Sequence, residues 1–387
     1  MKIRYVAVTL IVFLVVLVIF LFQFVGVRFS IKENNSLSDI QLPQDFHIEI
    51  FADGLGGSQV SIGGPNPGPR MLEFNKDKIL FTSIPSQGKV VALPDRNNDG
   101  RADETITFID GLNKPHGLAF YQEWLYIAEE DKVIRVKDLD NDLKADLDTL
   151  ETVVSNIPAG EGHFTRTIKI SGGYLYISIG SSCNVCNEEN PWRASIVRCN
   201  VDGKDCKVFA SGLRNSVGFI YNSRTGEIWA TENGRDWLGD DLPPEEINII
   251  KEGRNYGWPI CYGNKIHDTD FDKNVYIRDP CEDTEPPAVE MQAHSAPLGL
   301  AFNYGDNFPS EYQGGLFVAF HGSWNRGVPT GYKIVRIDKN LQVNDFATGW
   351  LKGSQVLGRP VDIVFSEEGM MYVSDDNAGV IYRIFYS

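Results

Sequence analysis

The sequence predicts an all-β fold, a single six-bladed β-propeller built from four-stranded antiparallel blades. One pattern of short apolar strands occurs six times, with successive copies beginning roughly 46 to 81 residues apart. After residue 45 no long segment shows the 3.6-residue apolar period of an amphipathic helix. The last copy lacks its fourth strand, and a spare apolar strand precedes the first copy.

Each copy is expected to supply three strands and a fourth that leads into the next copy. The first strands are predicted to begin near residues 69, 115, 166, 216, 297 and 360. The second strands are the most apolar, at residues 79–82, 124–128, 174–178, 227–231, 316–319 and 370–374. The third strands follow at residues 89–92, 133–136, 194–198, 246–250, 332–337 and 380–384. Short apolar runs bounded by Gly, Asn, Asp and Pro are typical of β-strands.

The spare strand, residues 47–51, is a candidate for the missing fourth strand of the last copy. If it pairs there, the amino-terminal strand closes the ring and no sheet edge is left between the first and last blades. We therefore expect one propeller domain over residues 45–387. The 42% hydrophobic content of the 387 residues is ample for its core.

The charge of the chain argues against one class of partner. The formal net charge is −16 at pH 7. A chain this acidic repels phosphate backbones, so no nucleic-acid partner is expected.

The amino terminus predicts one transmembrane helix. Lys2 and Arg4 precede an almost uninterrupted apolar run over residues 5–27, and a helix needs about 20 such residues to cross a bilayer. We interpret residues 1–28 as an uncleaved single-pass anchor, residues 29–44 as a polar tether, and the remainder as lying outside the cytoplasm. A cleaved signal peptide is the alternative, although its apolar run is shorter and Arg28 makes a poor cleavage site.

One face of the propeller is predicted to carry the functional site. Turns alternate between the two faces of an antiparallel blade, so the turns between second and third strands share a face with the links between blades. That face collects Arg70, His116, His163, Arg214, Asn215, His294 and Arg359. The longest insertions, at residues 180–186, 231–236 and 320–326, fall on it too. Long loops on one face of a rigid scaffold commonly hold binding and catalytic residues.

Two acidic loops fall on the opposite face. Their polar residues have the same spacing, and they are Asp95, Asn97, Asp99 and Asp103 in one loop and Asp138, Asp140, Asp142 and Asp146 in the other. Alternating carboxylate and amide oxygens suit a hard cation, so structural Ca²⁺ is predicted, with plain Asp-rich turns as the alternative. Gly100 supplies the tight turn in the first loop, and Leu143 stands in its place in the second.

Six cysteines, an even number, fit three disulfides in a chain that lies outside the cytosol. Cys199 and Cys206 flank a turn between strands, and Cys261 and Cys281 bracket the insertion in the fourth copy. Cys183 and Cys186 then pair within one loop. Three pairs of thiols are the alternative, as is a redox-active or zinc-binding role for the last pair.

Several strings of residues resemble the glucose/sorbosone dehydrogenase family. They are the segments 212–218 (GLRNSVG), 232–235 (ENGR), 248–259 (NIIKEGRNYGWP), 321–326 (HGSWNR) and 358–362 (GRPVD). Members of this family are aldose dehydrogenases that depend on pyrroloquinoline quinone (PQQ). Residues 181–186 (SSCNVC) resemble the sorbosone dehydrogenase branch most.

The resemblance implies roles for residues on the predicted functional face. His163 becomes the general base, which takes the proton of the anomeric hydroxyl while hydride passes to the quinone. Arg214 stabilises the negative oxygen that then develops. The cofactor contacts implied are Asn215, Arg326, Arg359, Asn325 and Trp324. Trp324 either stacks on the planar cofactor or pins its own loop.

The resemblance also implies a Ca²⁺ ion held by the backbone carbonyls of Gly234 and Arg235. The substrate would be an aldose or a sorbosone-like aldehyde, and the product a lactone or acid. Electrons would pass to an external acceptor, a quinone or a cytochrome. This chain departs from the soluble glucose enzymes at Ser181, where they have an Asp that orients the histidine, and at Arg235, where they have Pro.

Two other functions remain open at this point. A propeller that binds sugar or protein without catalysis would not need His163, Arg214, Asn215 and Arg326 together. A metal-dependent lactonase would need carboxylates that converge on a metal in the channel, and Glu232 and Asn233 are the residues available. The otherwise cationic set on this face favours an anionic cofactor over a bare metal.

Overall fold

The computed structural model describes residues 37–56 and 68–387. The predicted anchor and the first part of the predicted tether lie outside the described residues. Within the described ranges, no helix is long and apolar enough to cross a membrane.

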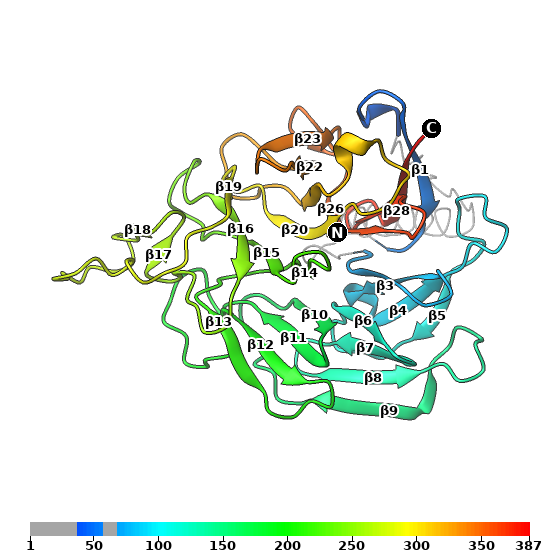
Figure 1. The fold of residues 1–387 in the computed structure, drawn as a ribbon, viewed down its shortest axis with the longest axis horizontal. Helices are drawn as coiled ribbons and strands as arrows, with labels where there is room; N and C mark the ends of the chain where they lie inside the picture. The colour runs from blue at the N-terminus through cyan, green and yellow to red at the C-terminus, as the bar shows by residue number, and fades with distance from the viewer. Residues whose placement is uncertain (1–36, 57–67) are drawn as a thin grey trace, which may run out of the picture. The chain divides into compact units, whose positions relative to one another are not determined.

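Six four-stranded antiparallel sheets make up the described chain, and Figure 1 shows them arranged about a common axis. The first three blades are β2 (Leu72–Phe74), β3 (Leu80–Ile84), β4 (Lys89–Leu93) and β5 (Ile106–Ile109); β6 (Leu118–Tyr121), β7 (Trp124–Ala128), β8 (Val133–Lys137) and β9 (Asp146–Val154); and β10 (Arg166–Ser171), β11 (Tyr174–Ile179), β12 (Ser195–Asn200) and β13 (Lys207–Ser211). The predicted six-bladed propeller is confirmed.

The remaining blades carry the longer insertions. They are β14 (Phe219–Tyr221), β15 (Ile228–Glu232), β16 (Glu245–Ile250) and β19 (Val289–Met291); β20 (Pro297–Phe302), β21 (Leu316–Phe320), β22 (Lys333–Ile337) and β23 (Val343–Ala347); and β26 (Pro360–Phe365), β27 (Met371–Asp375), β28 (Val380–Tyr386) and β1 (Phe46–Ala52). Two small hairpins are β17 (Cys261–Tyr262) with β18 (Ile266–His267), and β24 (Leu351–Lys352) with β25 (Gln355–Val356). Three short 3₁₀ helices are Leu37–Asp39, Pro85–Gln87 and Ser310–Tyr312.

The second strand of each blade forms because it is apolar on both sides. Every residue of β3 and of β21 is buried, since blades pack on both faces of each inner strand. The outermost strand of the second blade, β9, is exposed over most of its length. The apolar core therefore lies between neighbouring blades, where Phe81 of the first packs edge-on against Phe120 of the second.

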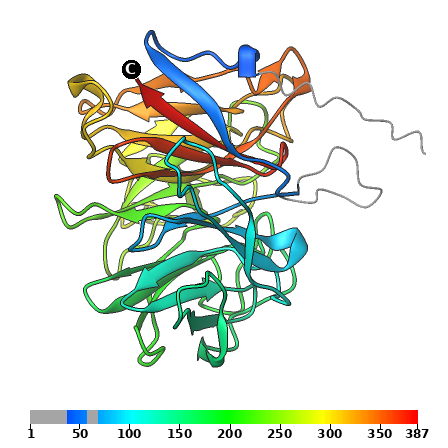
Figure 2. The same cartoon turned by 90° about the vertical axis from the view of Figure 1, so that its right-hand side faces the viewer.

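The amino-terminal strand closes the ring, as predicted. β1 pairs antiparallel with β28, with Phe46 opposite Tyr386 and Ile50 opposite Tyr382. Figure 2 shows the blue strand β1 beside the red strand β28. The Phe46 ring packs edge-on against the rings of Phe308 and Phe346 in the fifth blade.

Residues 37–44, part of the predicted tether, contact the propeller. The backbones of Gln41 and Thr348 donate to each other in a bridge, at 2.8 and 3.0 Å. Lys352 pairs with Asp39 at 2.8 Å. Contact with the fifth blade thus begins several residues before β1.

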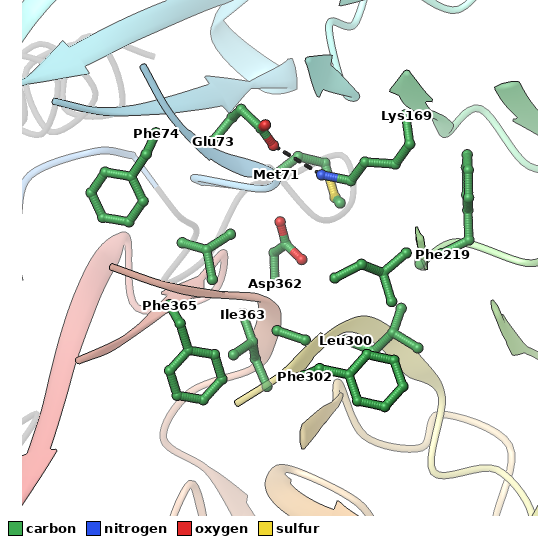
Figure 3. Close-up of a pocket in the computed structure, with 14 residues that line it drawn as sticks. Met71, Glu73, Phe74, Lys169, Phe219, Leu300, Phe302, Asp362, Ile363 and Phe365 are labelled. Carbon is green, nitrogen blue, oxygen red and sulfur yellow. Dashed lines mark hydrogen bonds and ion pairs between the residues drawn. The ribbon is translucent and has the colours of Figure 1, made fainter. Parts of the chain in front are cut away.

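The first strands of the blades line the axis and position the loops at either end. On the axis they enclose a cavity of about 300 Å³, bordered by four phenylalanines and by a charged cluster (Figure 3). Lys169 pairs there with Glu73 at 2.9 Å. The buried Asp362 accepts a hydrogen bond from the backbone of Leu72 at 2.9 Å.

Candidate functional site

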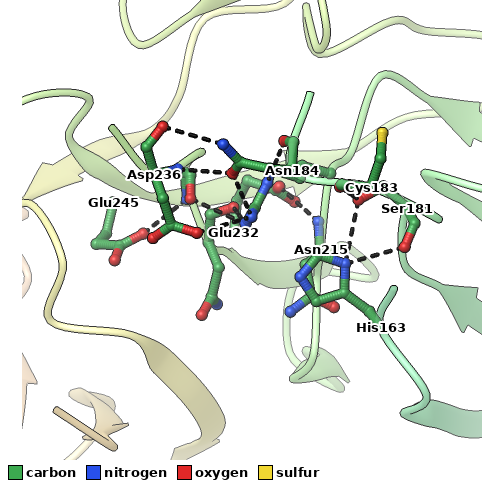
Figure 4. Close-up of polar contacts among 11 residues, drawn as sticks. His163, Ser181, Cys183, Asn184, Asn215, Glu232, Asp236 and Glu245 are labelled. Atoms are coloured by element: carbon green, nitrogen blue, oxygen red, sulfur yellow. Dashed lines mark hydrogen bonds and ion pairs between the residues drawn. The ribbon is translucent and has the colours of Figure 1, made fainter. Parts of the chain in front are cut away.

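The candidate site is built from segments that precede or follow the inner strands of the third and fourth blades. His163 lies in the link before β10, and Ser181 follows β11. Arg214 lies in the link before β14, and the turn after β15 carries Asn233 to Asp236. Figure 4 shows these segments meeting in one hydrogen-bonded network.

His163 is oriented by Ser181. Its ring Nδ1 lies 3.0 Å from the carbonyl oxygen of Ser181 and 3.1 Å from the Ser181 hydroxyl. A carbonyl can only accept a hydrogen bond, so Nδ1 carries the proton. The other ring nitrogen, Nε2, is then the basic one, and no hydrogen-bond partner for it exists among the described residues.

Burial, together with the nearby positive charge of Arg214, lowers the pKa of His163 to about 3. The imidazole is therefore neutral across the physiological range. A neutral, oriented imidazole with a free Nε2 can accept a proton from a bound hydroxyl.

Arg214 is held by the loop that follows Ser181 and by the turn after β15. Its Nε and one terminal nitrogen donate to the carbonyl and side-chain oxygens of Asn184, each at 2.9 Å. Its other terminal nitrogen donates to the carbonyls of Asn233 and Gly234, at 3.1 and 2.9 Å. The guanidinium is buried and fixed, and its backbone carbonyl accepts from Ser181 at 2.7 Å.

Two buried carboxyl groups support the backbone around Arg214. Glu232 accepts from the backbone N–H of Asn215 at 2.8 Å and from the hydroxyl of Ser216 at 2.6 Å. Glu245 accepts from the backbone N–H of Gly234 at 2.8 Å. Burial raises the pKa of Glu232 to about 8 and that of Glu245 to about 7. Because both Glu232 oxygens bind the protein itself, the structure does not favour its use as a lactonase metal ligand.

Gly180 lets His163 and Asn215 lie close together. A Cβ atom on Gly180 would meet the side-chain oxygen of Asn215 at 2.6 Å and the Cβ of His163 at 2.7 Å. Only glycine fits there without a shift. The two predicted site residues are thus brought to one place, on either side of the end of β11.

Arg326 and Arg359 belong to separate contacts on the same face. Arg326 donates to the carbonyl of Asp240 at 2.6 Å and pairs with Asp241 at 3.0 Å. Arg359 lies 3.3 Å from Nδ1 of His321 and 3.3 Å from the carbonyl of Gly322. Within the described ranges, no hydrogen bond joins either arginine to His163 or Arg214.

His321 contacts a buried ion pair, Asp376 with Arg70, that the sequence did not indicate. Its Nε2 lies 2.9 Å from one oxygen of Asp376, and Arg70 pairs with the other at 2.6 Å. Against the effect of burial, the interactions with His321 and Arg70 hold the pKa of the Asp376 carboxyl well below its usual range. Arg70, predicted to face the channel, thus has a partner of its own in the protein.

The other predicted residues take several environments. Trp324 is 68% exposed and meets Trp237 edge-on at 5.5 Å, while Asn325 is partly exposed. His116 is fully buried beside Thr167, and His294 lies 2.7 Å from the carbonyl of Gly239.

The predicted metal ligands are placed as follows. The Gly234 carbonyl accepts from Arg214, and the Arg235 side chain turns away to pair with the buried Asp268 at 2.6 Å. In the second acidic loop, carboxylate oxygens of Asp138, Asp140 and Asp146 lie within 4.8 Å of one another. Ca²⁺ at either place stays a prediction.

The two acidic loops have the same backbone form. In the first loop, Asp95 and Asn97 accept from the backbone of Asp99, and Asp103 accepts from that of Arg96. The equivalent oxygens in the second loop accept in the same way and come from Asp138, Asp140 and Asp146. Gly100 and Leu143 both have positive φ angles, 89° and 63°.

The three predicted disulfides are confirmed: Cys183–Cys186, Cys199–Cys206 and Cys261–Cys281. All six cysteines are therefore paired. The alternative of a zinc site at Cys183 and Cys186 does not fit their bonded state, since zinc binds thiolates.

Sequence reasoning missed Asn184, Asp236, Glu245 and Asp376. Asn184 stands inside the noted SSCNVC string, and Asp236 directly follows ENGR. The only indication in the sequence that Asn184 and Asp236 belong to the site was their position within or next to these segments. No such sign marks Glu245 or Asp376, because in the sequence a buried carboxylate cannot be told from a surface one.

The sequence was compared with protein families and with known proteins. The TrAA12-like family model matches residues 65–387. An uncharacterized protein of Borreliella burgdorferi is 31% identical over 376 residues, which cover 92% of this chain and 93% of that protein. A pyrroloquinoline quinone-dependent sugar dehydrogenase of Hypocrea jecorina is 24% identical over 417 residues and 90% of this chain.

One solved structure shows the same fold. The holo form of the pyranose dehydrogenase PQQ domain from Coprinopsis cinerea superposes with a TM-score of 0.74. It is 21% identical in sequence, and the match covers 89% of this chain and 97% of that domain.

Proposed function

The chain belongs to the TrAA12-like family, and from that premise we propose that it oxidises aldose sugars with PQQ as cofactor. The support is the arrangement of His163 and Arg214, together with the relatives that are named as PQQ-dependent sugar dehydrogenases. The proposal includes oxidation of sorbosone-like aldehydes, because residues 181–186 resemble the sorbosone dehydrogenase branch.

The residues present fit a planar polyanion. Arg214, Arg326 and Arg359 supply three guanidinium groups on one face, and Nε of Arg326 is buried without a hydrogen-bond partner. Gly180 allows His163 and Asn215 to lie close together on this face, because a Cβ atom there would meet both side chains. Arginine binds carboxylates through paired N–H groups, so Asn215, Arg326 and Arg359 would hold the cofactor's carboxylates, with Trp324 and Asn325 at the rim.

When bound, PQQ supplies an acceptor for the hydride and hence for two electrons. His163 would accept the proton of the sugar's anomeric hydroxyl at Nε2, while its Nδ1–H stays on the Ser181 carbonyl. The free Nε2 of an oriented, neutral His163 is the observation that carries the proposal.

Arg214 would provide positive charge where negative charge develops during the reaction. Its four hydrogen bonds to Asn184, Asn233 and Gly234 hold the guanidinium in place before any ligand arrives. Such preorganisation lowers the cost of reorganisation in the transition state. The carbonyls of Gly234 and Arg235 would hold the Ca²⁺ that accompanies the cofactor.

We further propose that the propeller works outside the cytoplasm, as a single-pass membrane protein anchored by residues 1–28. Three disulfides support an oxidising compartment. The electron acceptor would then be a quinone or cytochrome available on that side of the membrane.

The test is a PQQ titration of the metal-stripped full-length protein, with and without Ca²⁺, followed by sugar-driven reduction of a redox dye. We expect Ca²⁺-dependent binding and turnover on at least one aldose. His163→Gln should retain PQQ binding and lower kcat by at least about 100-fold, the size of a general-base contribution. If oxidised, folded protein binds no PQQ at micromolar concentrations, the proposal is wrong and a non-catalytic binding propeller takes its place.

A further inference from the structure

We propose that Asn184 is a positioning residue for Arg214, and that the Cys183–Cys186 disulfide holds Asn184 in the conformation that does so. The inference rests on the proposed function for its catalytic consequences. Its structural part concerns contacts of the protein alone and can be tested without cofactor.

Asn184 makes hydrogen bonds through both the oxygen and the nitrogen of its side-chain amide and through its backbone carbonyl. Its Oδ1 accepts from Arg214 at 2.9 Å and from the backbone N–H of Asp236 at 2.8 Å. Its Nδ2 donates to the Asp236 carbonyl at 3.1 Å, and its own carbonyl accepts from Nε of Arg214 at 2.9 Å. Only an amide of this length supplies an acceptor and a donor to one backbone residue while it also binds a guanidinium.

These contacts join two segments that are far apart in the sequence. Asn184 follows the third blade's second strand, whereas Asp236 belongs to the turn after β15 in the fourth blade. Arg214 lies between them and also binds the Gly234 carbonyl of that turn. Asn184 therefore links the third blade to the arginine side chain and to the turn of the fourth blade, in addition to the backbone hydrogen bond from Ser181 to Arg214.

The same loop reaches the candidate base. The Ser181 hydroxyl, which contacts His163, donates to the Cys183 carbonyl at 2.6 Å (Figure 4). Next to it, Ser182 donates to Glu188 from both its backbone and its hydroxyl, at 2.6 and 2.7 Å. One short loop thus touches His163 through Ser181 and Arg214 through Asn184.

The disulfide adds a covalent constraint to a loop that contains no strand. Residues 182–194 contain no strand, so no ladder of backbone hydrogen bonds fixes Asn184. A bridge between Cys183 and Cys186 closes a small ring around Asn184 and limits the conformations available to it. Because the Asn184 contacts need both its carbonyl and its side chain in fixed directions, this restriction acts on Arg214.

This bridge is also the most accessible of the three. Cys183 and Cys186 are both partly exposed, whereas Cys261 and Cys281 are both buried and Cys199 is buried in the remaining pair. A dithiol can reduce the bridge by thiol–disulfide exchange, in which it transfers two electrons and two protons, forms two cysteine thiols and is itself oxidised to a cyclic disulfide. We expect such treatment to release Asn184 before it affects the other bridges.

Amide hydrogen exchange of the cofactor-free protein tests the structural part. In Asn184→Ala and in the double variant C183S/C186S, exchange at residues 233–236 should accelerate about 10-fold, because Asp236 N–H loses its fixed acceptor. The matched control is C199S/C206S, which removes a bridge from β12 to the turn before β13 and should leave that segment unchanged. Unchanged exchange in the first two variants would overturn the inference whether or not the protein binds PQQ.

Kinetics of the loaded enzyme test the catalytic part. Asn184→Ala should lower kcat 10- to 100-fold with little change in the KM for sugar, the size expected when a group that orients a functional side chain is lost. Asn184→Asp keeps the acceptor for Arg214 and loses the donor, so its kcat should lie between those of wild type and Asn184→Ala. Equal kcat for all three proteins would show that Asn184 does not position Arg214.

Dithiothreitol provides the third comparison. Treatment of wild type should reproduce the kcat of C183S/C186S, and treatment of that variant should change nothing further. Failure of wild type to bind PQQ or oxidise sugar would contradict the proposed function alone, since the exchange experiment still decides the role of Asn184. A C183S/C186S protein with wild-type exchange and wild-type kcat would contradict the role of the disulfide.

Discussion

At His163 the position of the proton is set by a backbone carbonyl. The soluble glucose enzymes that the sequence resembles have an Asp where this chain has Ser181, a difference that put the basicity of the histidine in question. Here the Ser181 carbonyl and hydroxyl both face Nδ1. The carbonyl fixes the tautomer without adding a charge, so the imidazole stays neutral and its Nε2 stays available.

The titration of His163 can be measured directly. Since burial lowers its pKa to about 3, the ring should remain unprotonated from pH 8 down to about pH 4. We expect the ring ¹³Cε1–¹Hε1 NMR signal of His163, assigned by comparison with His163→Gln, to hold a constant shift over this range. A midpoint near pH 6.5 would mean that the ring is solvated and that its orientation by Ser181 is lost.

The sequence identified the proposed catalytic pair, His163 and Arg214, more readily than the residues that support it. His163, Arg214 and Asn215 stand at turns before inner strands, and the resemblance gave them roles. Glu232 accepts a hydrogen bond from the backbone N–H of Asn215, and Glu245 accepts one from that of Gly234. That support arises from pairing across a sheet and between distant segments, which no local pattern of residues records.

At the scale of elements, apolar strands were predictable and exposed ones were not. The second strands agree with the structure because blades cover both of their faces. The outer strand β9 begins at Asp146, inside the predicted acidic loop, and carries no alternating pattern since most of its residues face solvent. The hairpins β17–β18 and β24–β25 are too short for any periodicity to show.

Some backbone angles in the loops of the functional face could not be predicted from the sequence. Trp237, His294 and Ala296 have positive φ angles of 73°, 63° and 52°, a region that non-glycine residues seldom occupy. Tertiary contacts impose these angles, as where the backbone of Ala296 donates to Glu245 at 3.1 Å. Backbone strain of this kind is commonly found at functional sites.

The two larger disulfide loops should stabilise the fold by different amounts. Cys261–Cys281 spans 20 positions and Cys199–Cys206 spans 7. Loop-closure entropy then predicts losses of about 3 and about 2.5 kcal/mol in the free energy of unfolding on replacement by serines. Urea denaturation of C261S/C281S and C199S/C206S would measure both. A larger loss in the second variant would show that native packing, and not loop length, determines the contribution.

At the scale of the whole propeller, stability depends on the seam where β1 joins β28. Phe46 is 8% exposed and meets four aromatic rings edge-on. Phe46→Ala should therefore lower the free energy of unfolding by about 3–5 kcal/mol, through lost burial and a cavity. Thermal or urea denaturation would measure it, and His47→Ala, at an exposed position of the same strand, is the matched control. Equal effects of the two changes would mean that the seam is not sealed by Phe46.

The cavity on the axis gives the propeller a dependence on pH. Burial raises the pKa of Asp362 to about 6, although Lys169 opposes the shift. An elevated carboxyl pKa in the folded state contributes stability that is complete below the unfolded value, near 4, and is lost as pH rises through about 6. Asp362→Asn should therefore leave stability at pH 4 unchanged and raise it at pH 7 by up to about 3 kcal/mol. Urea denaturation at the two pH values would measure this, and a lower stability of the variant at pH 7 would show that Asp362 is needed as a charged partner of Lys169.

The seam between β1 and β28 also has a mechanical consequence. Phe46, at the start of β1, lies opposite Tyr386, at the end of β28. A force applied between the two ends of the propeller would thus pull on neighbouring residues and load the hydrogen bonds of the ladder one after another, like a zipper. The same ladder pulled along the strands would share the load among all its bonds. The propeller can therefore open under a small force at its ends, even though aromatic rings pack against each other at this seam.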